Sequence, residues 1–177
     1  MTKPLTVYVG LLRGVNVGGH NKLAMTDLRA LCEDLGYTDV RTFIQSGNVI
    51  FTSAKAPKMT TLEAAIKDRF AIETDVIFRN ASELDAAVKG NPFLRPQDSG
   101  LHVGFAAANI SETVVASLDH ERFAPDTFEV VGAEVYLFLP NGAGQSKLPA
   151  YLARQLKVPV TLRNWKTVTK LAELAFD

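Results

Sequence analysis

Residues 13–22 hold the side chains and backbone of this chain that are best suited to binding a ligand. The segment is Arg-Gly-Val-Asn-Val-Gly-Gly-His-Asn-Lys, between an apolar run and an amphipathic pattern. A glycine-rich loop that leads into a helix can hold an anion with outward-pointing amides and the helix dipole. The polar candidates in this loop are Arg13, Asn16, His20, Asn21 and Lys22. The alternative is a tight loop that needs glycine for left-handed backbone angles and asparagine for turn hydrogen bonds.

Three further segments, residues 45–48, 141–147 and 163–166, are rich in amide and cationic side chains. Their candidates are Gln45, Ser46, Asn48, Asn141, Lys147, Arg163, Asn164 and Lys166. A lysine at an expected helix start, as at position 147, opposes the helix dipole, so an anionic ligand or a neighbouring carboxylate would explain it. The basic residues of the last two segments predict a compact spot that suits phosphate, carboxylate or a nucleic-acid backbone.

No known reaction motif is complete in this chain. Gly14 and Gly19 have the spacing of a phosphate-binding P-loop, but His20 and Asn21 stand where that motif has Lys and Ser or Thr. Ser46 is not in the Gly-x-Ser-x-Gly context of hydrolases. His20 has the chemistry of a general base, with a solvated loop histidine as the alternative. No nucleophile and base can be paired, so whether the protein is an enzyme stays open, and no cofactor is identified.

Composition excludes several classes of protein. The chain has 177 residues, of which 47% are hydrophobic, and its 19 basic and 19 acidic residues cancel. A neutral chain has no overall attraction for nucleic acid or anionic membranes. No run approaches the roughly 20 apolar residues of a membrane span, and no secretory signal is present, so we expect a cytoplasmic protein. A single cysteine and three histidines without ligand spacing predict no disulfide and no metal site.

Hydrophobic periodicity predicts the same series of elements twice. In the first half we expect strands at 5–12, 40–44, 48–53 and 74–78, with helices at 25–36 and after a capping box of Thr60 and Glu63. Ser82 and Asp85 are expected to open a short bridging helix. In the second half we expect strands at 101–107, 127–131, 134–139 and 160–163, and helices at 111–118, 147–156 and 165–175. The closing helix would be capped by Asn164.

The order β-α-β-β-α-β in each half predicts an α+β protein made by tandem duplication of a ferredoxin-like unit. The expected parts are residues 1–79, a bridging helix and loop at 80–100, and residues 101–177 with a C-terminal helix. The repeat is architectural, with no residue-by-residue identity expected between the halves. In this topology the loop after the first strand and the hairpin between the second and third strands share one sheet edge. The ends of the third and fourth strands share the opposite edge, so each half gathers two of the polar segments.

The polar segments and their neighbours resemble those of the bacterial family called domain of unknown function 1697. The matching stretches include residues 13–19, 44–49, 91–93, 139–142, 146–148 and 163–165, and they cover essentially the whole chain. The resemblance implies two ferredoxin-like subdomains. It implies no activity, because no chemistry is established for that family.

Three functions therefore compete. The first is binding of a small anionic or nucleotide-like ligand in a cleft lined by the four polar segments. The second is RNA or single-stranded nucleic-acid binding through a ferredoxin-like sheet with Tyr8 or Phe51 exposed; zero net charge and apolar strands disfavour it. The third is a structural or interaction role, in which the glycine loops bond mainly to their own backbone. Oligomeric state, ligand identity and the relative orientation of the halves are not encoded in these patterns.

Overall fold

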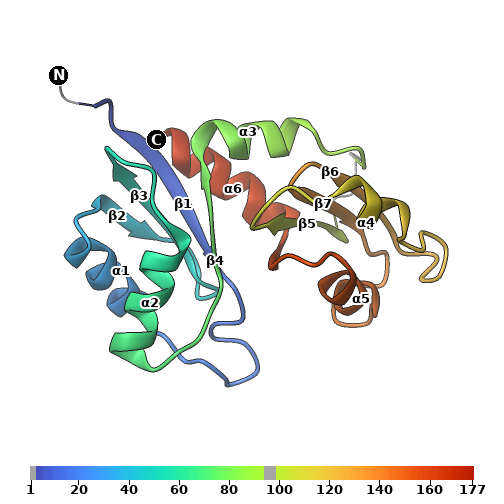
Figure 1. The fold of residues 1–177 in the computed structure, drawn as a ribbon, viewed down its shortest axis with the longest axis horizontal. Helices are drawn as coiled ribbons and strands as arrows, with labels where there is room; N and C mark the ends of the chain where they lie inside the picture. The colour runs from blue at the N-terminus through green and yellow to red at the C-terminus, as the bar shows by residue number, and fades with distance from the viewer. Residues whose placement is uncertain (1–2, 94–98) are drawn as a thin grey trace. The chain divides into compact units, whose positions relative to one another are not determined.

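The computed structural model describes residues 3–93 and 99–177, which form two compact units (Figure 1). The first unit comprises Met1–Ala86 and Lys170–Asp177, and the second comprises Ala87–Thr169. The expected bridging segment, residues 80–100, includes positions 94–98, which lie outside the described residues.

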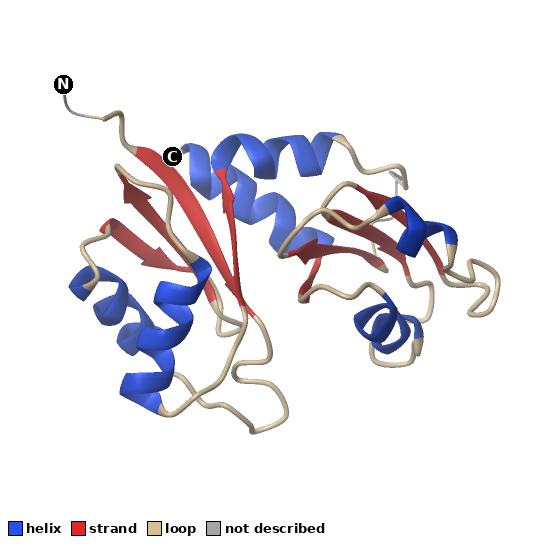
Figure 2. Ribbon diagram, viewed as in Figure 1, coloured by secondary structure: helices blue, strands red, loops and turns tan. Residues whose placement is uncertain are grey.

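The first unit contains one antiparallel sheet with two helices on one face (Figure 2). Its elements are β1 (Thr6–Leu12), α1 (Met25–Asp34), β2 (Thr38–Thr42), β3 (Asn48–Ser53), α2 (Met59–Phe70) and β4 (Val76–Asn80). The strand order is β2-β3-β1-β4. Helix α3 (Ala81–Lys89) follows β4 directly.

The second unit repeats this arrangement with the strand order β6-β7-β5-β8. Its elements are β5 (Leu101–Ala106), α4 (Glu112–Ala116), β6 (Thr127–Val131), β7 (Glu134–Phe138), α5 (Leu148–Gln155) and β8 (Val160–Asn164). Helix α6 (Trp165–Phe176) starts at the end of β8. The prediction of an α+β protein with two similar ferredoxin-like units and a C-terminal helix is confirmed.

Each unit has its own hydrophobic core between its sheet and its helices. In the first unit, Leu28, Leu62 and Phe51 are fully buried, and the ring of Phe51 stacks on Tyr37 at 4.1 Å. In the second unit, Leu137 and Leu152 belong to the corresponding core between the sheet and α5. Apolar residues at alternate strand positions therefore pack against the helices on one side of each sheet, and the intervening Val9 and Val103 are buried as well.

The two units also repeat particular residues at the same places in the sheet. Gly10 in β1 pairs with Val49 in β3, and Gly104 in β5 pairs with Val135 in β7. Each of these glycines follows a valine in the central strand of its sheet. These isolated matches add to the architectural repeat, for which no residue-by-residue identity between the halves was expected.

The last strand of each unit extends this repeat. β4 is Val-Ile-Phe-Arg-Asn and β8 is Val-Thr-Leu-Arg-Asn. Arg79 and Arg163 are both buried, and each donates a hydrogen bond to the carbonyl of the preceding residue, at 2.9 and 3.1 Å. Each strand ends in an asparagine that is followed immediately by a helix. The register of the central strand and this strand–helix junction are thus common to both units.

The helix starts differ from the sequence prediction. Helix α2 begins at Met59 after Lys58, which makes no side-chain cap, and Glu63 accepts a hydrogen bond from the amide of Val76 instead. The Thr60–Glu63 capping box was therefore wrong, because the carboxylate bonds to the start of β4. Helix α3 is opened by Asn80 and Glu83, whose side chains accept from each other's amides at 2.8 Å, rather than by Ser82 and Asp85.

Gly47 is the most tightly enclosed glycine among the described residues of the first unit, and a substitution can test this packing. Its φ is +84°, and an added Cβ would lie 2.5 Å from Val15 Cγ2 and 2.8 Å from Leu12 Cβ. Gly14 has a similar φ of +68° with open space around it. We expect Gly14→Ala to lower the free energy of unfolding by about 1 kcal/mol from backbone strain alone. Gly47→Ala should lower it by a further ~1–3 kcal/mol from overpacking.

Chemical denaturation of both variants measures this difference. Equal losses for Gly14→Ala and Gly47→Ala would contradict the close packing of the hairpin against the end of β1.

Candidate functional site

The structure brings the first two polar segments together at one edge of the first sheet. The amide of Leu12 donates to the carbonyl of Gly47 at 2.9 Å, and the side-chain amide of Asn16 donates to the carbonyl of Gln45 at 2.7 Å. This contact follows from topology, because β1 and β2 both run antiparallel to β3 and end at the same edge.

Asn16 is held by three hydrogen bonds within this edge. Its Nδ2 donates to the carbonyls of Leu23 and Gln45, and its Oδ1 accepts from the amide of Leu23 at 2.8 Å. Its φ is +55°, which asparagine tolerates better than most residues. Asn16 therefore closes the loop on itself rather than presenting its amide to a ligand.

Two other predicted asparagines also bond to their own loops. Asn21 Nδ2 donates to the carbonyl of Gly14 at 3.1 Å. Asn48 is fully buried and donates to the Phe43 carbonyl and to Ser46 Oγ, both at 3.0 Å. The side-chain amides of Asn16, Asn21 and Asn48 thus bond within their own turns, as in the structural alternative.

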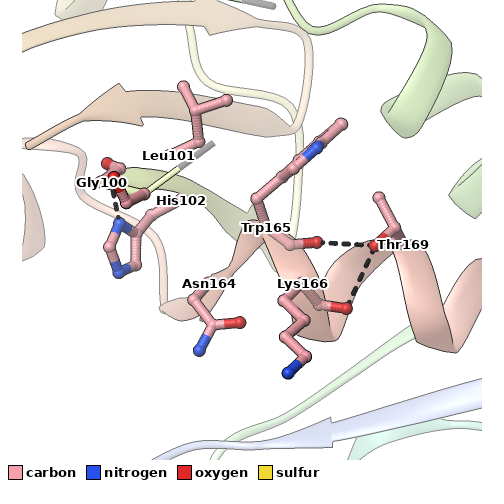
Figure 3. A pocket seen from close by; sticks show the side chains of 8 residues that line it. Gly100, Leu101, His102, Asn164, Trp165, Lys166 and Thr169 are labelled. Atoms are coloured by element: carbon pink, nitrogen blue, oxygen red, sulfur yellow. Dashed lines mark hydrogen bonds between the residues drawn. The ribbon is translucent and has the colours of Figure 1, made fainter. Parts of the chain in front are cut away.

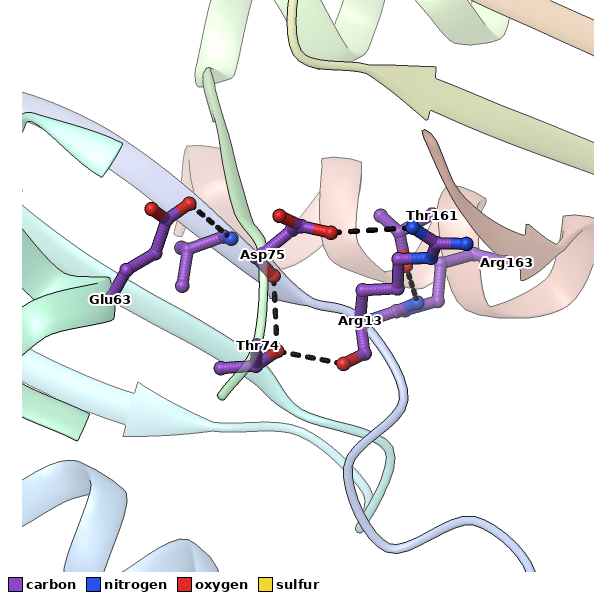
Figure 4. Close-up of polar contacts among 7 residues, drawn as sticks. Arg13, Glu63, Thr74, Asp75, Thr161 and Arg163 are labelled. Carbon is purple, nitrogen blue, oxygen red and sulfur yellow. Dashed lines mark hydrogen bonds and ion pairs between the residues drawn. The ribbon is translucent and has the colours of Figure 1, made fainter. Parts of the chain in front are cut away.

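The cations of the glycine loop (residues 13–22) lie at its surface. Arg13 forms an exposed ion pair with Asp75 at 3.3 Å, and its carbonyl accepts from Thr74 Oγ1 at 2.7 Å (Figure 4). Such exposed pairs contribute at most about 1 kcal/mol to stability. His20 and Lys22 are exposed, as is Gln45, whereas Ser46 is half-buried.

In the second unit, the segment before α5 is anchored by a serine. Ser146 Oγ donates to the Asp126 carboxylate at 2.6 Å and accepts from the amide of Leu148 at 3.1 Å. Lys147 is exposed and is the N-cap residue of α5 without a side-chain cap, and Asn141 is exposed. Ser146 therefore links the start of α5 to Asp126.

Arg163 is buried, whereas a cation that binds an anion from solvent would be expected to be exposed. It is 7% exposed and donates to Thr161 Oγ1 at 2.7 Å (Figure 4). Burial lowers the pKa of its guanidinium to about 10. Because successive strand residues face opposite sides of a sheet, Arg163 and Asn164 lie on opposite faces of β8.

An open pocket in the second unit collects the remaining predicted residues. It has a volume of about 540 Å³ and lies where β5 starts, β8 ends and α6 begins (Figure 3). Residues that line it include Gly100, His102, Asn164, Trp165, Lys166 and Thr169. Asn164 and Lys166 come from the predicted set, whereas His102 was missed.

His102 has one ring nitrogen fixed by the backbone. Its Nδ1 lies 3.1 Å from the carbonyl oxygen of Gly100. A carbonyl can only accept, so Nδ1 carries the proton and Nε2 of the neutral ring is an acceptor. The carbonyl of Gly100 also accepts a hydrogen bond from the amide of Leu139. Gly100 has a φ of +98°, and a Cβ added there would lie only 2.6 Å from the carbonyl oxygen of Leu139. One signal could have identified His102: the strands expected at 101–107 and 160–163 pair in this fold, and His102 is the register partner of Asn164.

The start of α6 is electropositive. Asn164 Oδ1 accepts from the amide of Thr167 at 2.8 Å, which confirms the predicted cap. The first turn of α6 contains Lys166 and no acidic residue, whereas the first turn of α3 contains Glu83. A lysine in the first helical turn adds to the positive end of the helix dipole, so an anion there is favourable.

Other chemistries find less support among the described residues. They contain no group of three or more His, Cys, Asp or Glu side chains that could hold a metal ion, and none of their helices has the length and apolar character to cross a membrane. Burial raises the pKa of the Cys32 thiol to about 12, which leaves it unreactive near neutral pH. Phe51 is fully buried and lies 5.9 Å from Tyr8 in the helix-side core, so this pair is not available to stack on bases.

Comparison with known proteins places the chain in a family. The model of the family described as "Protein of unknown function (DUF1697)" matches residues 5–136, and the chain belongs to this family. The conserved bacterial protein SP0830 from Streptococcus pneumoniae has a similar structure, with a TM-score of 0.71 and 25% sequence identity, over 97% of this chain and 99% of that one. No curated protein matches.

The structural role of Asn16 makes a measurable prediction. Asn16→Ala removes three hydrogen bonds and places alanine at a positive φ, so we expect a loss of about 2–4 kcal/mol in the free energy of unfolding. His20→Ala, in the same loop but exposed, should change it by less than about 0.5 kcal/mol. Urea unfolding measures both, and similar values for the two variants would show that Asn16 does not hold the loop.

Proposed function

We propose that this member of the DUF1697 family is a cytoplasmic protein that binds a small phosphorylated metabolite in the pocket of its second unit. Lys166 would neutralise the phosphate, and Asn164 and His102 would orient the ligand. The proposal rests on one observation above others: a lysine lies in the first turn of α6, in an open pocket, with no acidic residue in that turn.

The unfavourable position of Lys166 argues for an anionic ligand. A cation near a helix N-terminus opposes the dipole by about 0.3–1 kcal/mol, and a bound anion reverses the sign of this interaction. Lys166 has no ion pair with a carboxylate among the described residues. A phosphate in the pocket would supply the missing negative charge and accept several hydrogen bonds at once.

The pocket has the size of a metabolite site. Its volume of about 540 Å³ falls within the roughly 300–1,000 Å³ of small-molecule pockets. Trp165, Leu101 and Gly100 add apolar and backbone surface beside the polar groups. Such a lining suits a phosphate ester of nucleotide or smaller size. The proposed function is binding, since no nucleophile is paired with a base among the described residues of the pocket.

A second candidate function is an interaction role for the glycine loop. Its asparagines bond to the loop backbone, and Val17 at the loop surface is 60% exposed. A loop whose side-chain amides bond to its own backbone offers few of them to an anion, which suits an interaction role better than capture of an anion.

The phosphate site is tested by thermal unfolding with inorganic phosphate. A ligand at twenty times its Kd stabilises a protein by about 1.8 kcal/mol, which raises the Tm of a chain of this size by a few degrees. We expect this shift in the native protein and in Lys55→Ala, an exposed lysine in the first unit. Lys166→Ala should lose most of it.

The comparison between the two lysine variants removes general salt effects, because both lose one exposed charge. An equal phosphate shift in Lys166→Ala and Lys55→Ala would rule out the proposed site.

A further inference from the structure

The internal repeat supplies a reference for the second-unit pocket. Tyr8 pairs with Asn80 in the first unit, and His102 pairs with Asn164 in the second. Tyr8 and His102 are therefore at equivalent places, on the helix side of the central strand. The second unit has an imidazole where the first has a phenol that packs in the core.

The helices that follow Asn80 and Asn164 also differ at equivalent positions. Counting from the asparagine, Lys166 of α6 corresponds to Ser82 of α3, and Thr169 corresponds to Asp85. Thr167 likewise replaces Glu83, which caps α3. On one backbone scaffold, the second unit thus lacks two carboxylates and gains a cation and an imidazole.

Three side chains of the pocket, His102, Asn164 and Lys166, offer one hydrogen-bond acceptor and two donors. When the His102 ring is neutral, its Nε2 atom accepts, because Nδ1 faces the Gly100 carbonyl and must carry the proton. Asn164 Oδ1 is taken by the amide of Thr167, which leaves the Nδ2 group of Asn164 as a donor, and Lys166 Nζ is a second donor with a positive charge. In Figure 3, the imidazole, the amide and the ammonium group extend toward the same side of the pocket.

We infer that the ligand is a hydroxylated phosphate ester, such as a polyol or sugar phosphate. This inference rests on the proposed phosphate site. The phosphate lies against Lys166 and Asn164 Nδ2, and a hydroxyl of the same molecule donates to His102 Nε2. A phosphate monoester without hydroxyl groups satisfies the two donors, but its ionised phosphate has no proton to offer the acceptor. The histidine therefore selects for a ligand with a hydroxyl group.

Two phosphate esters with the same three-carbon skeleton test this selection. Propyl phosphate has no hydroxyl, and glycerol 3-phosphate has two. Isothermal titration calorimetry with the full chain should show tighter binding of glycerol 3-phosphate, by about 2- to 10-fold, the value of one net hydrogen bond.

Variants at position 102 assign the preference to the histidine. His102→Phe keeps a ring, as Tyr8 does at the equivalent place, but removes the acceptor. It should bind propyl phosphate as the native protein does and lose the preference for glycerol 3-phosphate. His102→Gln provides a side-chain oxygen as an acceptor and should keep at least part of the preference, which gives a result even where His102→Phe does not fold.

The outcomes separate this inference from the proposed function. Equal binding of both esters, lost in Lys166→Ala, would overturn the inference and leave the phosphate site intact. A preference that persists in His102→Phe, or that vanishes in His102→Gln while propyl phosphate still binds, would also overturn it. Binding of neither ester to the native protein would overturn both proposals.

Discussion

The strand–helix junction at an asparagine is the constraint on which both units depend. Asn80 is the last residue of β4 and caps α3, and Asn164 is the last residue of β8 and caps α6. One residue thus ends a strand within the sheet register and starts a helix. Since the strand position fixes the backbone and the cap fixes the helix start, the first helical turn is held beside the start of the central strand.

This constraint explains how one scaffold carries two different surfaces. In the first unit, the carboxylate of Glu83 offsets the positive end of the α3 dipole and completes a reciprocal cap with Asn80. In the second unit the corresponding turn has Lys166 and no acidic residue, next to His102 from the paired strand. Charge at the junction varies while the asparagine cap stays, so the two units can carry different surfaces without a change of fold.

The fold could be predicted because its signals are periodic and local. Alternating and helical apolar patterns gave the strands and helices of both units, and the direction of the strands predicted the contact of the glycine loop with the 45–48 hairpin. The helix caps were harder to predict, because a carboxylate such as Glu63 can bond either to an amide close in sequence or to one that is close only in the folded unit. Its bond to the amide of Val76 joins residues that only the folded unit brings together.

The candidate site was predictable only in part, for a related reason. Asn164 and Lys166 stand at a strand end before a helix, which the sequence shows. His102 joins them only through the pairing of β5 with β8, and an isolated histidine in a strand carries no motif. In the glycine loop the residue types suggested a ligand site, but the hydrogen bonds of Asn16 and Asn48 serve the backbone. Residue type alone does not tell whether an amide faces a ligand or its own loop.

Amide-resolved NMR during titration with inorganic phosphate tests the central claim most directly, because it reports where an anion binds without any substitution. A phosphate at the asparagine junction of the second unit predicts the largest concentration-dependent shifts at residues 100–102 and 164–169. Shifts confined to residues 13–22 or 141–147, or no saturable shift at all, would contradict it.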